Sequence, residues 1–67
     1  MMAYEEFRNK IEQELRKAQG PLTWTEIRNR AQLPQKFPNN RWTHQLENDI
    51  GLERKRDIHG VIHWQVR

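Results

Sequence analysis

Residues 39–66 read NNRWTHQLENDIGLERKRDIHGVIHWQV, a pattern that predicts a short helix followed by a basic β-hairpin. The helix is expected over residues 40–50, because its apolar residues recur at four-residue steps along one helical face. These apolar residues are Trp42, Leu46 and Ile50. Either Asn39 or Asn40 supplies the N-cap, and Gly51 stands where a left-handed residue commonly follows a helix.

The hairpin is predicted from a charged strand, a turn and an alternating strand. Residues 52–56 form the first strand, and residues 57–60 form a turn that starts with Asp and ends with Gly, as a type I turn prefers. Residues 61–66 form the returning strand. Its alternating apolar residues, which are expected to face the core, are Ile62, Trp64 and Val66.

Two helices are predicted before this unit. The first has an apolar face of about four turns and is ended by the Gly-Pro pair at 20–21. Its apolar face consists of Tyr4, Phe7, Ile11, Leu15 and Ala18. The second helix follows a stub of strand at residues 22–24. It runs from Thr23 to about Ala31, because Thr23 and Glu26 have the spacing of a capping box.

A connector of residues 32–38 separates the second helix from the third. Pro34 and Pro38 exclude a continuous helix through it. Leu33 and Phe37 are expected to enter the core from this connector. The inner face of the second helix consists of Trp24, Ile27 and Ala31. The residues expected on its outside are Arg28, Asn29 and Arg30.

The length and composition exclude several classes of protein. A chain of 67 residues allows one domain, assigned to residues 1–67, with a modest core. The chain contains no cysteine, so disulfides and thiolate metal sites are excluded. Its apolar runs are far shorter than the ~20 residues that a membrane helix requires, and no signal peptide is recognised. A cytoplasmic location without a membrane partner is therefore expected.

The net charge of +3 is distributed unevenly along the chain. Residues 1–20 contain four bases and four acids, so the excess of positive charge lies downstream. A basic surface on a neutral scaffold is typical of a protein that binds a polyanion. Charge alone leaves equal room for an ordinary solvated surface that happens to be basic.

The order helix, strand, helix, helix, strand, strand predicts an α+β fold and resembles the winged helix-turn-helix family over nearly the whole chain. The resemblance rests on LTWTEI at 22–27, NRWTHQL at 40–46, the glycine-leucine step at 51–52 and HWQV at 63–66. It implies a small domain of three helices and a C-terminal hairpin wing, in the order α-β-α-α-β-β. One departure is the connector of about eight residues before the third helix, where a helix-turn-helix has three or four.

The same resemblance implies a nucleic-acid-binding module and a role in transcriptional regulation. Its third helix is expected to lie in the major groove of duplex DNA, with the wing on the DNA backbone, and DNA is favoured over RNA. Arg can bind guanine through two hydrogen bonds, and Asn or Gln can bind adenine. The residues expected to contact nucleic acid are Arg28, Arg30, Arg41, His44, Gln45, Asn48, Arg54, Lys55 and Arg56.

Three acids interrupt this basic surface. Glu47 flanks the exposed face of the third helix, and Glu53 and Asp57 flank the bases of the wing. Carboxylates beside a groove repel phosphate groups. The alternative is therefore a winged-helix module that docks onto a protein partner, and RNA binding also stays open. A monomer is expected in each case.

The sequence contains no pattern typical of an active site. It has no serine, no cysteine and no glycine-rich loop that could hold a phosphate. His59 and His63 fall in the turn and the strand of the hairpin, about 13 Å apart in extended chain, which is too far to share one metal ion. No enzymatic activity, cofactor or metal is therefore expected.

Overall fold

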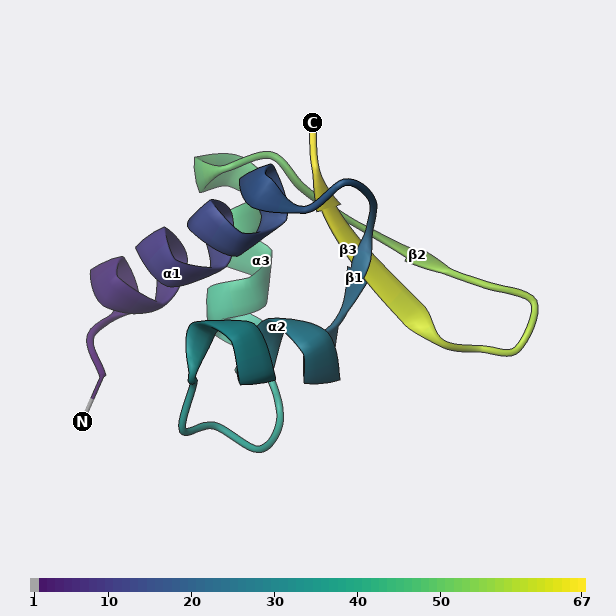
Figure 1. Cartoon of the computed structure of the whole chain (residues 1–67). Coiled ribbons are helices and arrows are strands. Elements are labelled where there is room, and N and C mark those ends of the chain that lie inside the picture. Colours follow the sequence, from purple (N-terminus) through teal and green to yellow (C-terminus); the bar gives the residue numbers. More distant parts are fainter. Residues whose placement is uncertain (1) are drawn as a thin grey trace.

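The computed structural model describes residues 2–67, which form three helices and a three-stranded antiparallel sheet (Figure 1). The elements follow the predicted order α-β-α-α-β-β, so the protein is a small α+β structure. They are α1 (Tyr4–Lys17), β1 (Leu22–Thr23), α2 (Trp24–Ala31), α3 (Asn40–Asp49), β2 (Leu52–Arg56) and β3 (Ile62–Val66). Within residues 2–67, every helix is too short or too polar to cross a lipid bilayer.

Capping side chains define the starts of α2 and α3. The Glu26 amide donates a hydrogen bond to the Thr23 hydroxyl at 3.2 Å, and the Thr23 amide donates one to the Glu26 carboxylate at 2.9 Å. This is the predicted capping box, and the bond from the Thr23 amide lowers the pKa of Glu26. At α3 the cap is Asn39, whose side chain accepts from the Trp42 amide at 3.1 Å.

The helix ends differ slightly from the prediction. α1 ends at Lys17, before the Gly-Pro pair at 20–21, because Ala18 adopts an extended backbone and packs against the core. α3 ends at Asp49, one residue early, and Gly51 follows with a φ of +69°. Glycine adopts a left-handed φ at little cost, so Gly51 turns the chain from α3 into β2.

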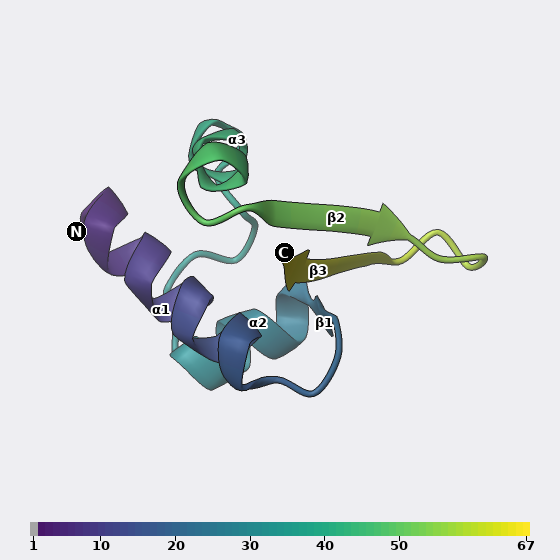
Figure 2. The same cartoon turned by 90° about the horizontal axis from the view of Figure 1, so that it is seen from above.

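β3 is the central strand of the sheet, with β1 on one side and β2 on the other. β2 and β3 form the predicted hairpin, although β3 begins at Ile62, one residue later than expected. The Gly60 amide donates to the Asp57 carbonyl at 3.0 Å, as a type I turn requires. The hairpin extends beyond the helices, so its turn lies away from the body of the molecule (Figures 1 and 2).

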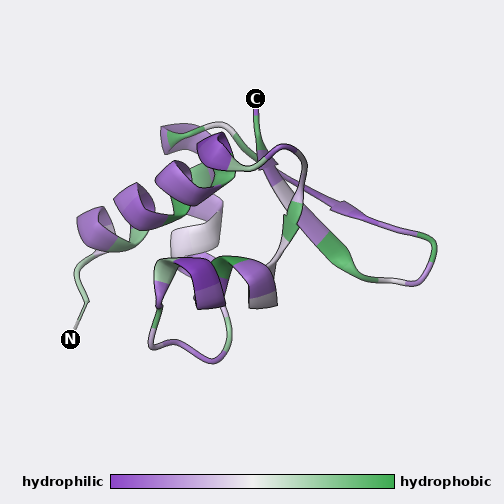
Figure 3. Ribbon diagram, viewed as in Figure 1, coloured by the Kyte–Doolittle hydropathy of each residue, from purple (hydrophilic) through white to green (hydrophobic). Residues whose placement is uncertain are grey.

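The core lies where the helices meet the inner face of the sheet. Its buried apolar residues are Phe7, Ile11, Leu15, Leu22, Ile27, Ala31, Leu33, Leu46, Ile50, Leu52 and Trp64. Trp64 is only 2% exposed, which confirms its predicted place in the core, and its ring centre lies 5.4 Å from that of Trp24. Figure 3 shows hydrophilic residues on the outer side of α1 and an apolar segment at the end of the hairpin.

The connector between α2 and α3 corrects one prediction. Leu33 is buried as expected, but Phe37 is 72% exposed. The Trp24 indole N–H donates to the Lys36 carbonyl at 3.0 Å, which holds the connector backbone against α2. Leu33 supplies the buried apolar contact of this segment, and the Phe37 ring stays outside, 5.7 Å from the Lys36 ammonium.

Candidate nucleic-acid interface

The outer face of α3 presents the polar residues that the sequence predicts for base contacts. All four are exposed: Arg41, His44, Gln45 and Asn48. They face outward because the opposite side of α3 packs on the core through Leu46 and the half-buried Trp42. Thr43 is also buried, although the apolar pattern of the sequence does not indicate it, and its hydroxyl donates to the Asn39 carbonyl at 2.8 Å.

An acid lies beside this face. Glu47 Oε2 is 3.6 Å from His44 Nδ1, one turn earlier on α3. Residues three apart on a helix are neighbours, so the sequence spacing alone permits this pair. The His44 ring therefore already has a carboxylate next to it, on the side of α3 that faces the hairpin.

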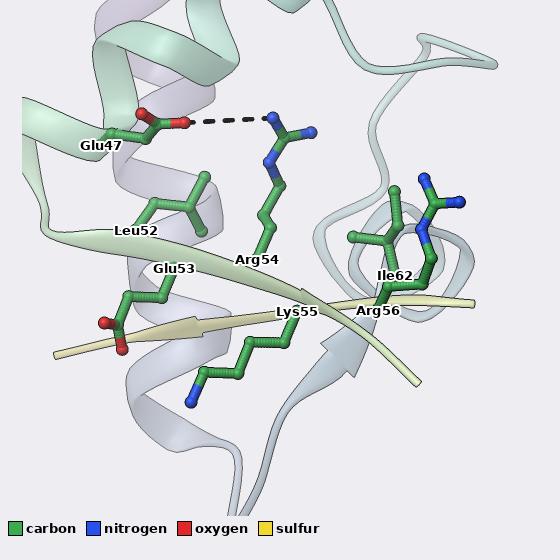
Figure 4. A pocket seen from close by; sticks show the side chains of 7 residues that line it. All are labelled: Glu47, Leu52, Glu53, Arg54, Lys55, Arg56 and Ile62. Atoms are coloured by element: carbon green, nitrogen blue, oxygen red, sulfur yellow. Dashed lines mark ion pairs between the residues drawn. The ribbon is translucent and has the colours of Figure 1, made fainter. Parts of the chain in front are cut away.

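The register of the hairpin separates the three wing bases. Arg54 pairs with Trp64 and Arg56 pairs with Ile62, so these two arginines share the face of the buried tryptophan. Lys55 pairs with His63 on the opposite face. Figure 4 shows Arg54 and Arg56 on the side of α3, and Lys55 on the other side of the strand. One surface therefore receives two of the three bases.

Arg54 makes two contacts within the protein. Its Nη2 lies 4.0 Å from Glu47 Oε2, and its guanidinium centre lies 5.6 Å from the centre of the Trp64 ring. The Arg54 side chain is 27% exposed, against 71% for the side chain of Arg67. Arg54 thus connects the hairpin to α3 and covers one side of the core tryptophan.

A hollow of about 450 Å³ lies where α3 meets the strands of the hairpin (Figure 4). We call it the helix–wing corner, and its lining residues are Glu47, Leu52, Glu53, Arg54, Lys55, Arg56 and Ile62. The carboxylate of Glu47 points to the Arg54 guanidinium across this corner, whereas the Glu53 side chain lies on the other side of the strand (Figure 4). Glu53 is instead 3.6 Å from Arg67.

The two arginines predicted on α2 do not line the corner. Arg28 is half-buried rather than outside, which corrects the prediction, because its Nε donates to the Gln35 carbonyl at 2.8 Å. This bond ties the connector to α2 and gives Arg28 a structural role. Arg30 is exposed, as predicted.

The turn of the wing is held by the carboxylate of Asp57. Its Oδ1 accepts from the His59 amide at 2.8 Å and the Val61 amide at 3.0 Å, and its Oδ2 lies 2.9 Å from His63 Nε2. The bond to His63, followed by those from the two amides, lowers the pKa of Asp57. In the described part of the chain, no three His, Cys, Asp or Glu side chains gather as metal ligands.

The charged and polar side chains on α3 and the hairpin are the features of this protein that bear most directly on its function. A scan against protein-family models and searches of curated proteins and of solved structures found no match to this chain. Chemically, the surface combines hydrogen-bonding side chains on an exposed helix with guanidinium groups on an adjoining hairpin. Such groups suit hydrogen-bond donors and acceptors on base edges and negative charges on phosphates.

Proposed function

We propose that this protein is a winged helix-turn-helix module that binds duplex DNA as a monomer and has no catalytic activity. In this proposal α3 lies in the major groove, the β2–β3 hairpin is the wing, and the module serves transcriptional regulation. The observation that carries the proposal is the outward polar face of α3, which adjoins a hairpin with Arg54 and Arg56 on the side of that helix.

The order of the elements, the small sheet and the contacts of the connector support the winged-helix assignment. A two-residue β1 pairs with β3, so a small sheet supports the projecting hairpin. The connector between α2 and α3 has eight residues, 32–39, against three or four in a helix-turn-helix. Its backbone is held by side chains of Trp24 and Arg28, so a long connector still fixes α3 relative to α2.

The proposed contacts divide into two kinds. Arg41, Gln45 and Asn48 suit hydrogen bonds to base edges, because they are exposed on α3 and carry the donors and acceptors that bases recognise. Arg54 and Arg56 suit phosphates next to that groove, and such contacts fix the position of a protein without reading sequence. Lys55 on the opposite face of the hairpin and the exposed Arg30 on α2 would add positive charge.

A titration with duplex DNA tests the proposal. We expect amide shifts at Arg41, His44, Asn48 and the wing when ¹⁵N-labelled protein receives a 20-base-pair duplex at about 50 mM salt. Between about 50 and 200 mM salt, the logarithm of the binding constant should fall with a slope of roughly −4 to −5, for four to six neutralised phosphates. Absence of any shift at the lower salt concentration contradicts the proposal.

Matched arginine variants locate the interface. Arg41→Ala is expected to weaken duplex binding by about 1–3 kcal/mol if Arg41 contacts a base. Arg16→Ala removes an exposed arginine from α1, where Arg16 pairs with Glu12 at 2.9 Å, and should change affinity less than twofold, by about 0.4 kcal/mol or less. Equal losses for the two variants would mean that only net charge matters.

A duplex RNA of the same sequence should bind more weakly, because its major groove is too deep and narrow for α3.

Phe37 supports a second candidate function, in which the module docks onto a protein. Phe37 is 72% exposed in the connector, between the exposed Lys36 and the half-buried Pro38. Phenylalanine is enriched in protein interfaces relative to the rest of the surface. Phe37→Ser separates the two candidates, because it should leave duplex affinity unchanged and abolish co-purification of a protein partner. Loss of DNA binding in this variant would argue against docking at Phe37.

A further inference from the structure

Glu47 occupies a position that the DNA-binding proposal does not explain. Its carboxylate lies between His44 on α3 and Arg54 on β2, at 3.6 and 4.0 Å. It therefore contacts one residue from each half of the proposed interface. Glu53, the other acid near the wing bases, projects to the opposite side of the strand (Figure 4). Only Glu47 places a carboxylate on the α3 side of the helix–wing corner, among the residues that line it.

We propose that Glu47 weakens the binding of phosphates in the helix–wing corner by pairing with the Arg54 guanidinium. This inference rests on the proposed function, since it concerns the same interface. A phosphate binds an arginine best through two parallel hydrogen bonds, so it competes with the Glu47 carboxylate for Arg54 Nη2. The displaced carboxylate then stays close to a phosphate of the same charge, which opposes binding.

The consequence is a cost that any DNA sequence meets at this corner. Every duplex presents the same phosphates, so the cost lowers the affinity for all DNA sequences by a similar amount. Arg56 lines the same corner and, within residues 2–67, has no carboxylate within ion-pair distance, so its contact with a phosphate carries no such cost.

The test compares Glu47→Gln with Glu53→Gln on a random-sequence duplex. Both variants remove one negative charge, but only Glu47→Gln releases Arg54. Glu47→Gln is expected to tighten binding by about threefold to tenfold at about 50 mM salt and to make the salt slope more negative by about one. Glu53→Gln should tighten binding by less than about twofold. Equal gains for the two variants would overturn the inference.

A double-mutant cycle tests whether Glu47 acts through Arg54. In an Arg54→Gln background, the gain from Glu47→Gln should fall below about twofold, because the partner is already absent. In an Arg56→Gln background, which loses the same charge from the same face, the gain should persist. A gain in affinity that survives in the Arg54→Gln protein would overturn the inference. If Arg54→Gln does not fold, the comparison of Glu47→Gln with Glu53→Gln still tests the inference.

A measurement without DNA separates this inference from the proposed function. The Arg54 Nε–H resonance of the free protein should move in Glu47→Gln and stay in place in Glu53→Gln. An unmoved resonance in both variants would overturn the inference while leaving DNA binding intact. Failure of both the wild type and Glu47→Gln to bind any duplex at low salt would overturn the proposed function, and the inference with it.

Discussion

The Tyr4 hydroxyl links the first turn of α1 to the last residue of α3. It donates a hydrogen bond to Asp49 Oδ2 at 2.6 Å, and the Tyr4 ring meets the edge of Trp42 with 5.6 Å between ring centres. Partial burial raises the pKa of Tyr4 to about 12, and the hydrogen bond and negative charge of Asp49 act in the same direction. The contact therefore requires a protonated tyrosine.

Stability should fall in alkaline solution through this one residue. The pKa of Tyr4 is about 12 in the folded protein against 10.0 as the ordinary value, so the folded state retains the proton more tightly. The contribution is fully present below pH 10 and is lost as the pH rises through 12. Urea unfolding at several pH values in this window should show a flatter profile for Tyr4→Phe than for the wild type. Parallel profiles would contradict the prediction.

At the scale of elements, the wing turn depends on a side chain rather than on apolar packing. Ile58 at its tip is 95% exposed, so it contributes no core contact. The Asp57 carboxylate instead accepts the amides of His59 and Val61 and meets His63. The hydrogen bond with His63, followed by those from the two amides, lowers the pKa of Asp57 below its ordinary value of 3.8. The ionised carboxylate therefore stabilises the turn at pH values above 3.8, and this stabilisation is lost as the pH falls through the pKa of the folded state.

Asp57→Ala should loosen the wing turn without unfolding the protein. The His59 and Val61 amides lose their acceptor, so their hydrogen exchange should accelerate, while amides in α1 keep their protection. Asp57→Asn is the matched control, because it retains an acceptor oxygen and removes the charge. It should preserve most of the protection at neutral pH and abolish the acid dependence. Unchanged exchange in Asp57→Ala would contradict this account of the turn.

At the scale of the whole molecule, Trp64 connects the sheet to the helices. It lies on the central strand, stacks near Trp24 of α2 and lies beneath Arg54 of the hairpin. A small domain has a stability of roughly 0.05–0.15 kcal/mol per residue, which is about 3–10 kcal/mol for this chain. A single core side chain of this size is therefore a large part of the total.

Trp64→Ala is expected to cost about 3–5 kcal/mol and to leave much of the protein unfolded at 25 °C. Ile58→Ala also removes apolar atoms, but from an exposed position, and should change stability by less than about 0.5 kcal/mol. Circular dichroism during urea unfolding measures both. A cooperative transition in Trp64→Ala at the wild-type midpoint would show that the core does not depend on this residue.

The elements themselves follow from local chemistry that a sequence displays. The Thr23–Glu26 capping box, the Asn39 cap and the Gly51 stop each involve residues a few positions apart, and each is present in the fold. The alternation at Trp64 likewise places it in the core. Neighbouring residues determine these features, because backbone geometry brings positions three or four apart together in any helix and alternates side chains in any strand.

The sequence by itself therefore determined the order of elements, the outward face of α3 and the hairpin. Only the tertiary structure decided that Phe37 stays outside, that Arg28 binds the connector, and that Arg54 meets Glu47. The physical reason is distance along the chain. The Arg54 contact requires α3 and β2 to settle at one angle, and no local pattern of helix or strand encodes that angle.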